Sequence, residues 1–194
     1  MEEHRNYKRR KLDELFYSED TEAPFSNCSL CDKYLLEEGV RYMIEKAVKY
    51  NKHYNVKETI FEHAICTDCA EKMRENLSKE SLKSIEQYFM QNMQQQQRYD
   101  LMTSENTETN DWLSNCLLSG EEIGEQEEYQ IYAECDGSDM LFEMTPYMIS
   151  GKVLESVSEL LSKQTKDELD RYMDEHFGVP PELRELFRDK VLIF

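Results

Sequence analysis

The chain has 194 residues, 39% of them hydrophobic, with only 6 glycines and 4 prolines. This composition favours an ordered, helix-rich protein over a disordered one. No stretch approaches the roughly 18 consecutive apolar residues of a membrane-spanning helix, and the charged first residues lack the apolar core of a secretory signal. We therefore expect a cytoplasmic protein with no membrane partner, whose six cysteines are thiols rather than disulfides.

The formal net charge of −18 is concentrated in the second half of the chain. Residues 100–194 carry 23 acidic and 7 basic side chains, whereas residues 1–99 carry 18 and 16. A half this acidic repels phosphate backbones, which counts against general nucleic-acid binding. One basic cluster lies near the N-terminus, and we interpret it either as a solvated, frayed terminus or as an arm that touches nucleic acid or an acidic partner. Its members are Arg5, Lys8, Arg9, Arg10 and Lys11.

The first half contains the pattern of a long hairpin followed by helices. Residues 39–50 and 58–65 are rich in β-branched and aromatic residues, which favours two strands, and the polar residues 51–57 fit the loop between them. Residues 70–77 have a good helix composition, and apolar residues at helical spacing predict a second helix from about Lys79.

Shifts in composition divide the chain into five predicted segments. These are a charged N-terminal arm (1–24), a four-cysteine zinc-binding unit (25–92), a polar linker (93–111), a metal-free acidic repeat (112–178), and a C-terminal short helix with an apolar tail (179–194). The last four residues of the tail are apolar. They are therefore expected either to dock onto the core of this protein or to insert into a partner or dimer mate.

Two C-x2-C pairs, Cys28 with Cys31 and Cys66 with Cys69, predict one structural zinc site. A closed shell of four sulfurs leaves no coordination position for a substrate, so the site is expected to stabilise the fold. Iron and a thioredoxin-like redox pair are the alternatives for these cysteines. His63 precedes Cys66 by three residues, and we interpret it as a strand residue beside the site, with replacement of one sulfur ligand as the alternative.

The second half resembles the first in sequence. A shift of 84 residues places 65–79 over 149–163 with six identities, and a shift of 88 places Cys28 over Cys116. Six identities in this window predict an internal duplication, although similar helix compositions arising independently are the alternative.

The predicted second copy lacks metal ligands. The four ligand positions map to Cys116, Ser119, Ser150 and Val153, and one thiol cannot hold a structural zinc. Cys116 and Cys135 are interpreted as ordinary buried or half-buried thiols. Apolar residues are expected to stabilise this copy instead. The inward series of the first helix, Cys69, Ala70, Met73, Asn76 and Leu77, becomes Val153, Leu154, Val157, Leu160 and Leu161.

A cysteine pair, a hairpin, and a second pair in the first turn of a helix resemble the treble-clef zinc finger. The resemblance covers residues 25–77, and more weakly 115–161, and rests on Cys28, Cys31, Cys66 and Cys69. It implies an α+β fold of two small treble-clef-like units, the first stapled by zinc. Treble clefs serve many roles, so the resemblance says little about function.

No catalytic motif is visible, and we expect a protein that is not an enzyme. Residues 136–139, Asp-Gly-Ser-Asp, fit a hairpin turn better than a calcium loop. The expected function is that of an intracellular zinc-binding module that interacts with another protein or regulates it. The alternative is a nucleic-acid-binding regulator that uses the basic arm and the zinc unit, with the acidic half as a modulatory element.

Overall fold

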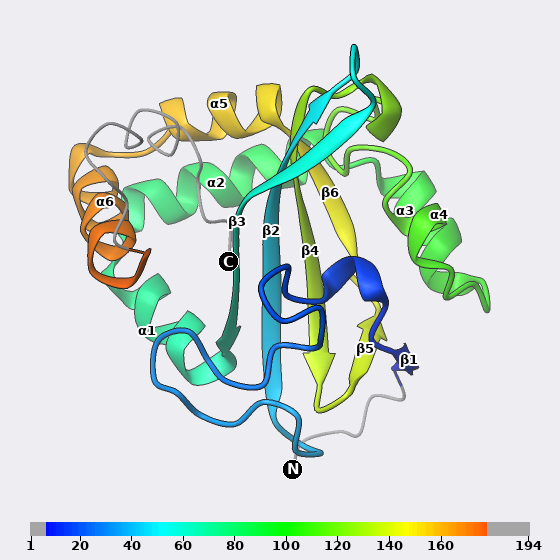
Figure 1. Cartoon of the computed structure of the whole chain (residues 1–194). Coiled ribbons are helices and arrows are strands. Elements are labelled where there is room, and N and C mark those ends of the chain that lie inside the picture. The colour runs from blue at the N-terminus through cyan, green and yellow to red at the C-terminus, as the bar shows by residue number, and fades with distance from the viewer. Residues whose placement is uncertain (1–6, 178–194) are drawn as a thin grey trace.

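The computed structural model describes residues 7–177, and its framework is one antiparallel sheet of six strands. The strand order is β1-β5-β4-β2-β3, and β6 pairs with β4 on the same side as β5 (Figure 1). The strands are β1 (Lys8–Lys11), β2 (Arg41–Asn51), β3 (Val56–Cys66), β4 (Glu128–Asp136), β5 (Asp139–Phe142) and β6 (Tyr147–Ser150).

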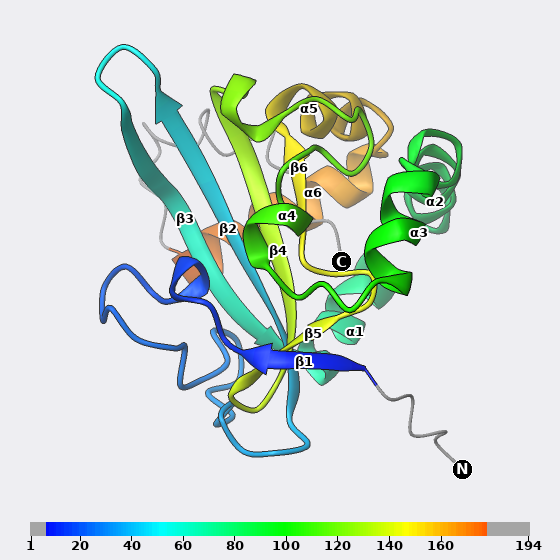
Figure 2. The ribbon, with the colours of Figure 1, turned by 90° about the vertical axis from the view of Figure 1, so that its right-hand side faces the viewer.

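Helices lie mainly on one side of this sheet. Figure 2 shows α1, α2 and α5 on one side and the N-terminal segment with the short helix η1 on the other. The α-helices are α1 (Thr67–Asn76), α2 (Lys79–Asn92), α3 (Gln95–Thr103), α4 (Thr109–Trp112), α5 (Gly151–Glu159) and α6 (Lys163–Phe177). The two 3₁₀ helices are η1 (Glu14–Phe16) and η2 (Ile123–Glu125). The expected α+β class is therefore confirmed, and none of the described helices is long and apolar enough to cross a membrane.

The predicted hairpin is present as β2 and β3. These strands pair from Tyr42 opposite Cys66 to Asn51 opposite Val56, with one irregularity after Ala47. Asn55 has a φ of 52° in the turn, a conformation that asparagine tolerates better than most residues. The long hairpin carries the second cysteine pair back to the beginning of β2.

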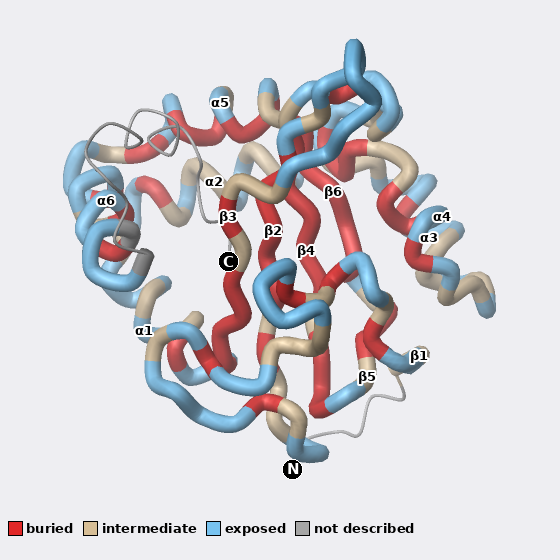
Figure 3. The backbone as a smooth tube through the Cα atoms, in the orientation of Figure 1, coloured by how far each residue is buried: buried red, intermediate tan, exposed pale blue. Residues whose placement is uncertain are grey.

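Strands from both halves of the chain pair with each other. β2 runs antiparallel to β4 from Arg41 opposite Asp136 to Lys49 opposite Glu128. Both strands are buried along most of their length (Figure 3). The units predicted from the sequence therefore share one sheet and one core.

The segment expected to be a polar linker is largely helical. Residues 95–103 form α3, and Arg98 is only 5% exposed. Its guanidinium donates a hydrogen bond to the Pro146 carbonyl at 3.0 Å and lies 5.0 Å from the centre of the Trp112 ring. One buried arginine therefore anchors a helix whose other polar residues face solvent.

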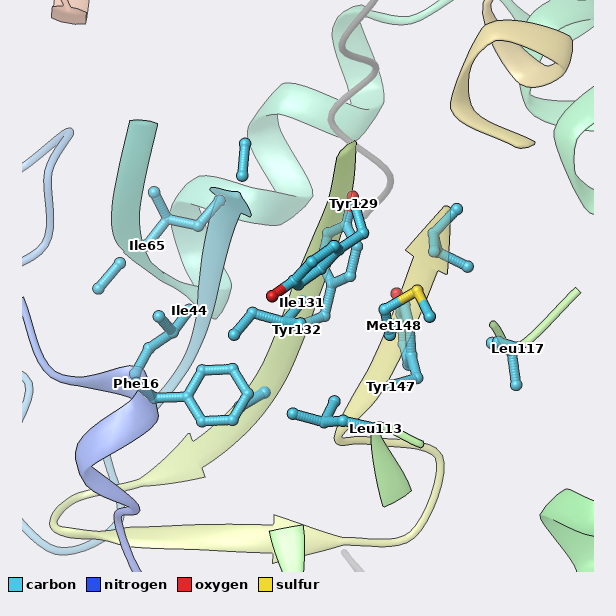
Figure 4. Close-up of a cluster of buried hydrophobic side chains, with 14 of the residues drawn as sticks. Phe16, Ile44, Ile65, Leu113, Leu117, Tyr129, Ile131, Tyr132, Tyr147 and Met148 are labelled. Carbon is cyan, nitrogen blue, oxygen red and sulfur yellow. The ribbon is translucent and has the colours of Figure 1, made fainter. Parts of the chain in front are cut away.

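The N-terminal arm is not frayed within the described residues. Lys8–Lys11 form β1 at the sheet edge, paired with β5, and Phe16 of η1 is fully buried. Phe16 belongs to the same apolar cluster as Ile44 and Ile131 (Figure 4). The apolar residues between the charges decide the position of this segment, because burying them outweighs the solvation of their neighbours.

The turn predicted at residues 136–139 joins β4 to β5. Gly137 has a φ of 59° there, and a side chain at this position would approach the Glu37 carbonyl oxygen to 3.1 Å. A hairpin turn is therefore confirmed. The predicted C-terminal helix and apolar tail, 179–194, lie outside the described residues.

Candidate metal centre

The first cysteine pair lies in a tight turn that is anchored to β3. The Cys28 N–H donates to the Lys33 carbonyl at 2.8 Å, and the Asp32 N–H donates back to the Cys28 carbonyl at 3.0 Å. The Ser29 N–H donates to the Ala64 carbonyl at 2.9 Å. These hydrogen bonds hold the turn beside the last residues of β3, where the second pair begins.

The second pair spans the junction between β3 and α1. Cys66 is the residue before the first helical turn, and Cys69 lies within that turn. The Cys66 N–H donates to the Cys28 sulfur at 3.4 Å. A helix N-terminus presents free N–H groups and a positive dipole end, and both stabilise thiolates.

The four predicted ligands come together. Their sulfur atoms all lie within 4.8 Å of one another, and the Cys31 and Cys66 sulfurs are 3.7 Å apart. Tetrahedral zinc with Zn–S bonds of about 2.3 Å requires sulfurs about 3.8 Å apart, so the cluster fits this ion. Cys28, Cys66 and Cys69 are buried, whereas Cys31 is exposed. Among residues 7–177, these cysteines form the only group of at least three potential metal ligands at such distances.

The electrostatics of the four thiols favour a bound cation. Burial opposes ionisation of Cys28, but backbone N–H groups of Cys66, Leu30 and Cys31 outweigh it and lower the pKa of Cys28 to about 7. Burial raises the pKa of both Cys66 and Cys69, and the neighbouring Cys28 raises each further. Four thiolates so close together repel one another, and a divalent cation removes this penalty.

His63 lies outside the sulfur cluster. It is buried in β3 directly opposite Glu45 of β2, and its Nε2 atom is 3.6 Å from a Glu45 carboxyl oxygen. Burial lowers the pKa of His63 to about 3 and raises the pKa of Glu45 well above its usual value. His63 is therefore neutral near pH 7, and burial favours the neutral form of Glu45 as well. Sequence reasoning did not find Glu45, since a glutamate within a strand gives no signal of being fully buried.

A second turn with a related hydrogen-bond pattern begins at Cys116. The Cys116 N–H donates to the Glu121 carbonyl at 2.8 Å, and the Leu117 N–H donates to the Met148 carbonyl at 2.8 Å. The Ser150 N–H donates to the Cys116 sulfur at 3.4 Å. Cys116, Ser150 and Val153 are buried, but the cysteine is the only strong zinc ligand among them. Cys135 is a buried thiol in β4, as predicted.

Helix α6 from the second half forms part of the surroundings of the first cysteine cluster. A groove of about 330 Å³ lies between α1 and α6, and its lining includes Cys31, Cys69, Met73, Leu169 and Tyr172. The position of α6 could not be predicted, because it depends on tertiary packing between residues about a hundred positions apart.

Comparisons of the chain with protein-family models, with curated proteins and with solved structures found no match.

Proposed function

We propose that the chain is a non-enzymatic zinc-binding protein that holds one structural zinc ion on Cys28, Cys31, Cys66 and Cys69. The observation that carries this proposal is the approach of all four sulfurs within 4.8 Å. Sulfur donors select zinc over hard cations such as magnesium and calcium, and a four-sulfur shell suits a closed structural site.

Metal analysis of the purified protein tests this proposal. We expect about one zinc per chain, released by a reagent that modifies thiols. Cys66→Ser should lose the metal and Cys116→Ser should retain it. Two zinc ions per chain would contradict a metal-free second turn. Iron in place of zinc, or labile disulfides without metal, would instead support the alternatives.

We also propose that the two halves are copies of one treble-clef-like unit. One backbone hydrogen bond and one backbone-to-sulfur contact between the Cys28 turn and β3 have counterparts 88 or 84 residues further on. The bond from Ser29 to Ala64 measures 2.9 Å and its counterpart from Leu117 to Met148 measures 2.8 Å. The contacts from the Cys66 and Ser150 N–H groups to the Cys28 and Cys116 sulfurs are both 3.4 Å. If the Cys116 turn had arisen independently of the Cys28 turn, there would be no reason for its long-range hydrogen bonds to match those of the Cys28 turn.

Hydrogen bonds between the beginning of α2 and the beginning of α6 support the same proposal. The Ser78 N–H donates to the Thr165 hydroxyl at 3.0 Å, and the Ser162 N–H donates to the Ser81 hydroxyl at 2.8 Å. The Ser78 and Ser162 hydroxyls are 2.9 Å apart. These four residues are two equivalent pairs under the shift of 84, and their contacts are reciprocal, as a two-fold axis between copies requires.

Apolar packing in α5 is consistent with replacement of the metal. Leu154 and Val157, at the positions of Ala70 and Met73, are buried. Leu160 is 36% exposed, so the expectation that it faces inward is wrong. It lies at the end of α5, where the helix has already turned this position toward solvent. Val153, Leu154 and Val157 therefore form the apolar face.

The proposed biological role is that of a protein-interaction or regulatory module. The β2–β3 hairpin projects beyond the rest of the sheet (Figures 1 and 2). Near its tip, Tyr54 is 71% exposed and Val56 is 54% exposed. A photo-crosslinking residue at position 54 should capture a protein partner that the same residue at position 90 does not. Met90 is a suitable control position, because it is also exposed and apolar but lies on α2.

Contacts within the chain hold the described members of the basic cluster, and this weakens the nucleic-acid alternative. Lys8 donates to the Leu101 and Ser104 carbonyls at 2.8 and 2.7 Å. The other three described members of the basic cluster are ion-paired within the chain: Arg9 with Asp136, Arg10 with Glu108, and Lys11 with Asp139. Nucleic-acid affinity that falls steeply with salt, and is lost on deletion of residues 1–11, would restore this alternative.

A further inference from the structure

The four cysteines of the candidate zinc site differ in their accessibility. Cys31 is exposed, whereas Cys28, Cys66 and Cys69 are buried. The groove between α1 and α6 opens beside Cys31 and Cys69, and its volume of about 330 Å³ is large enough for a small reagent. Figure 1 shows α1 and α6 as neighbours at this side of the molecule. A dissolved oxidant therefore reaches the sulfur of Cys31 before the other three.

A second sulfur is positioned to complete an oxidation that begins at Cys31. The Cys66 sulfur is 3.7 Å from the Cys31 sulfur. The two residues belong to different pairs, since Cys31 lies in the first turn and Cys66 ends β3. A bond between them would join the turn to the strand and would remove two of the four ligands in one event.

We propose that Cys31 is a site of oxidation by hydroperoxides, with Cys66 as the resolving thiol. In the first step the Cys31 thiolate attacks one peroxide oxygen. An S–O bond forms and the O–O bond breaks, and the other peroxide oxygen leaves as hydroxide from hydrogen peroxide or as alkoxide from an organic hydroperoxide, so that sulfur is oxidised to a sulfenic acid and the peroxide is reduced. In the second step the Cys66 thiolate attacks this sulfur, an S–S bond forms and the S–O bond breaks with loss of hydroxide.

Oxidation at this position has a defined consequence for the site. Two thiolates, Cys28 and Cys69, remain after the Cys31–Cys66 disulfide forms, and two ligands do not complete a structural zinc shell. Zinc release therefore accompanies the disulfide. The inference rests on the proposed zinc site and adds a reactive position to it. Buried Cys116 gives an internal reference, because it should stay reduced.

The test compares two variants that each keep four zinc ligands. Cys31→His and Cys69→His both convert the shell to three sulfurs and one nitrogen, which zinc accepts. Zinc-loaded proteins are treated with hydrogen peroxide, and released zinc is followed with a chromogenic chelator. Because exposure governs thiolate oxidation, Cys31→His should release zinc about tenfold more slowly than the wild type, whereas Cys69→His should release it at least as fast. Peptide mass spectrometry should find the Cys31–Cys66 disulfide in the wild type.

A second measurement does not depend on the variants. In the zinc-loaded wild type, substoichiometric iodoacetamide should label Cys31 before any of the other five cysteines. Equal labelling of the four ligands, or faster labelling of Cys69, would overturn the inference, as would equal rates of zinc release in the two histidine variants. A wild-type protein that never binds zinc would instead defeat the proposed function.

Discussion

The turns at Cys28 and Cys116 share a backbone hydrogen-bond pattern but differ in the side chains that close them. The first contains Cys28 and Cys31 and faces Cys66 and Cys69, and the four sulfurs lie within 4.8 Å of one another. The second faces Ser150 and the apolar face of α5. The same backbone arrangement is thus compatible with a metal-centred and an apolar interior. A bound metal fills space and crosslinks the elements that carry its ligands. Branched aliphatic side chains fill space but form no such crosslink.

Loss of zinc should be the largest effect. Structural zinc contributes roughly 10–16 kcal/mol of apparent binding free energy in small zinc-finger peptides. Cys66→Ser should therefore lose metal and unfold at a much lower temperature, whereas Cys116→Ser should keep about one zinc and most of its stability. Metal content and calorimetry on the two variants check this difference. Similar losses in both variants would show that the two turns are not chemically distinct.

Introducing a second metal site at the Cys116 turn would test most directly whether the two turns have the same backbone arrangement. Ser119→Cys, Ser150→Cys and Val153→Cys together give the second turn four cysteines with Cys116, and we expect this triple variant to bind about two zinc ions per chain. The single variant Val153→Cys is the control and should bind one. Failure of a folded triple variant to take up a second ion would contradict the proposed equivalence.

Truncation of the apolar face should affect the second half strongly. Leu154 is buried in α5, and Leu154→Ala should lower the free energy of unfolding by about 2–5 kcal/mol, because it removes buried methyl groups and leaves a cavity. Leu160→Ala, at a 36% exposed position, should cost less than about 0.5 kcal/mol. Chemical denaturation with zinc present throughout measures both. Equal costs would refute the assignment of the face.

Acid sensitivity should differ between wild type and His63→Gln. The pKa of His63 is about 3 in the folded protein, against its ordinary value of 6.5. Below pH 6.5 the unfolded chain therefore binds a proton at His63 that the folded chain does not bind. The contribution of His63 to the free energy of unfolding is lost as the pH falls further. Buried Glu45 has the opposite effect, since its raised pKa keeps a proton in the folded state.

The difference in free energy of unfolding between the wild type and His63→Gln gives the contribution of His63 alone. Relative to His63→Gln, the wild type should lose about 1.4 kcal/mol per pH unit between pH 6.5 and 4.5, because one proton is involved. Denaturation curves of both proteins across this range measure the difference. A constant difference would mean that His63 titrates normally when folded.

The smallest predicted effect concerns the hydroxyls between α2 and α6. Ser78→Ala and Ser162→Ala each remove a helix-capping acceptor and should cost about 1 kcal/mol. Because the two serines contact each other, the double variant should cost less than the sum of the single ones. Strict additivity in a double-mutant cycle would argue against the reciprocal cluster.

Local features of the chain were predictable from the sequence. The β2–β3 hairpin, α1, the beginning of α2 and the turn at Gly137 follow from strand composition, helical spacing and glycine chemistry over short distances. The four cysteines were predictable for the same reason, because each C-x2-C pair closes a turn within four residues. The hairpin then needs only correct pairing to bring Cys66 beside Cys28.

Tertiary structure alone decided how these local elements combine. Pairing of β2 with β4 joins residues about ninety positions apart, and no short pattern encodes such a register. The same long-range packing buries Phe16 and Arg98 in segments expected to be loose and places α6 beside the cysteine cluster. Composition and spacing determine which local structures form and which ligands exist. The burial of apolar surface shared by both halves determines where those structures meet, because that free energy depends on the whole chain.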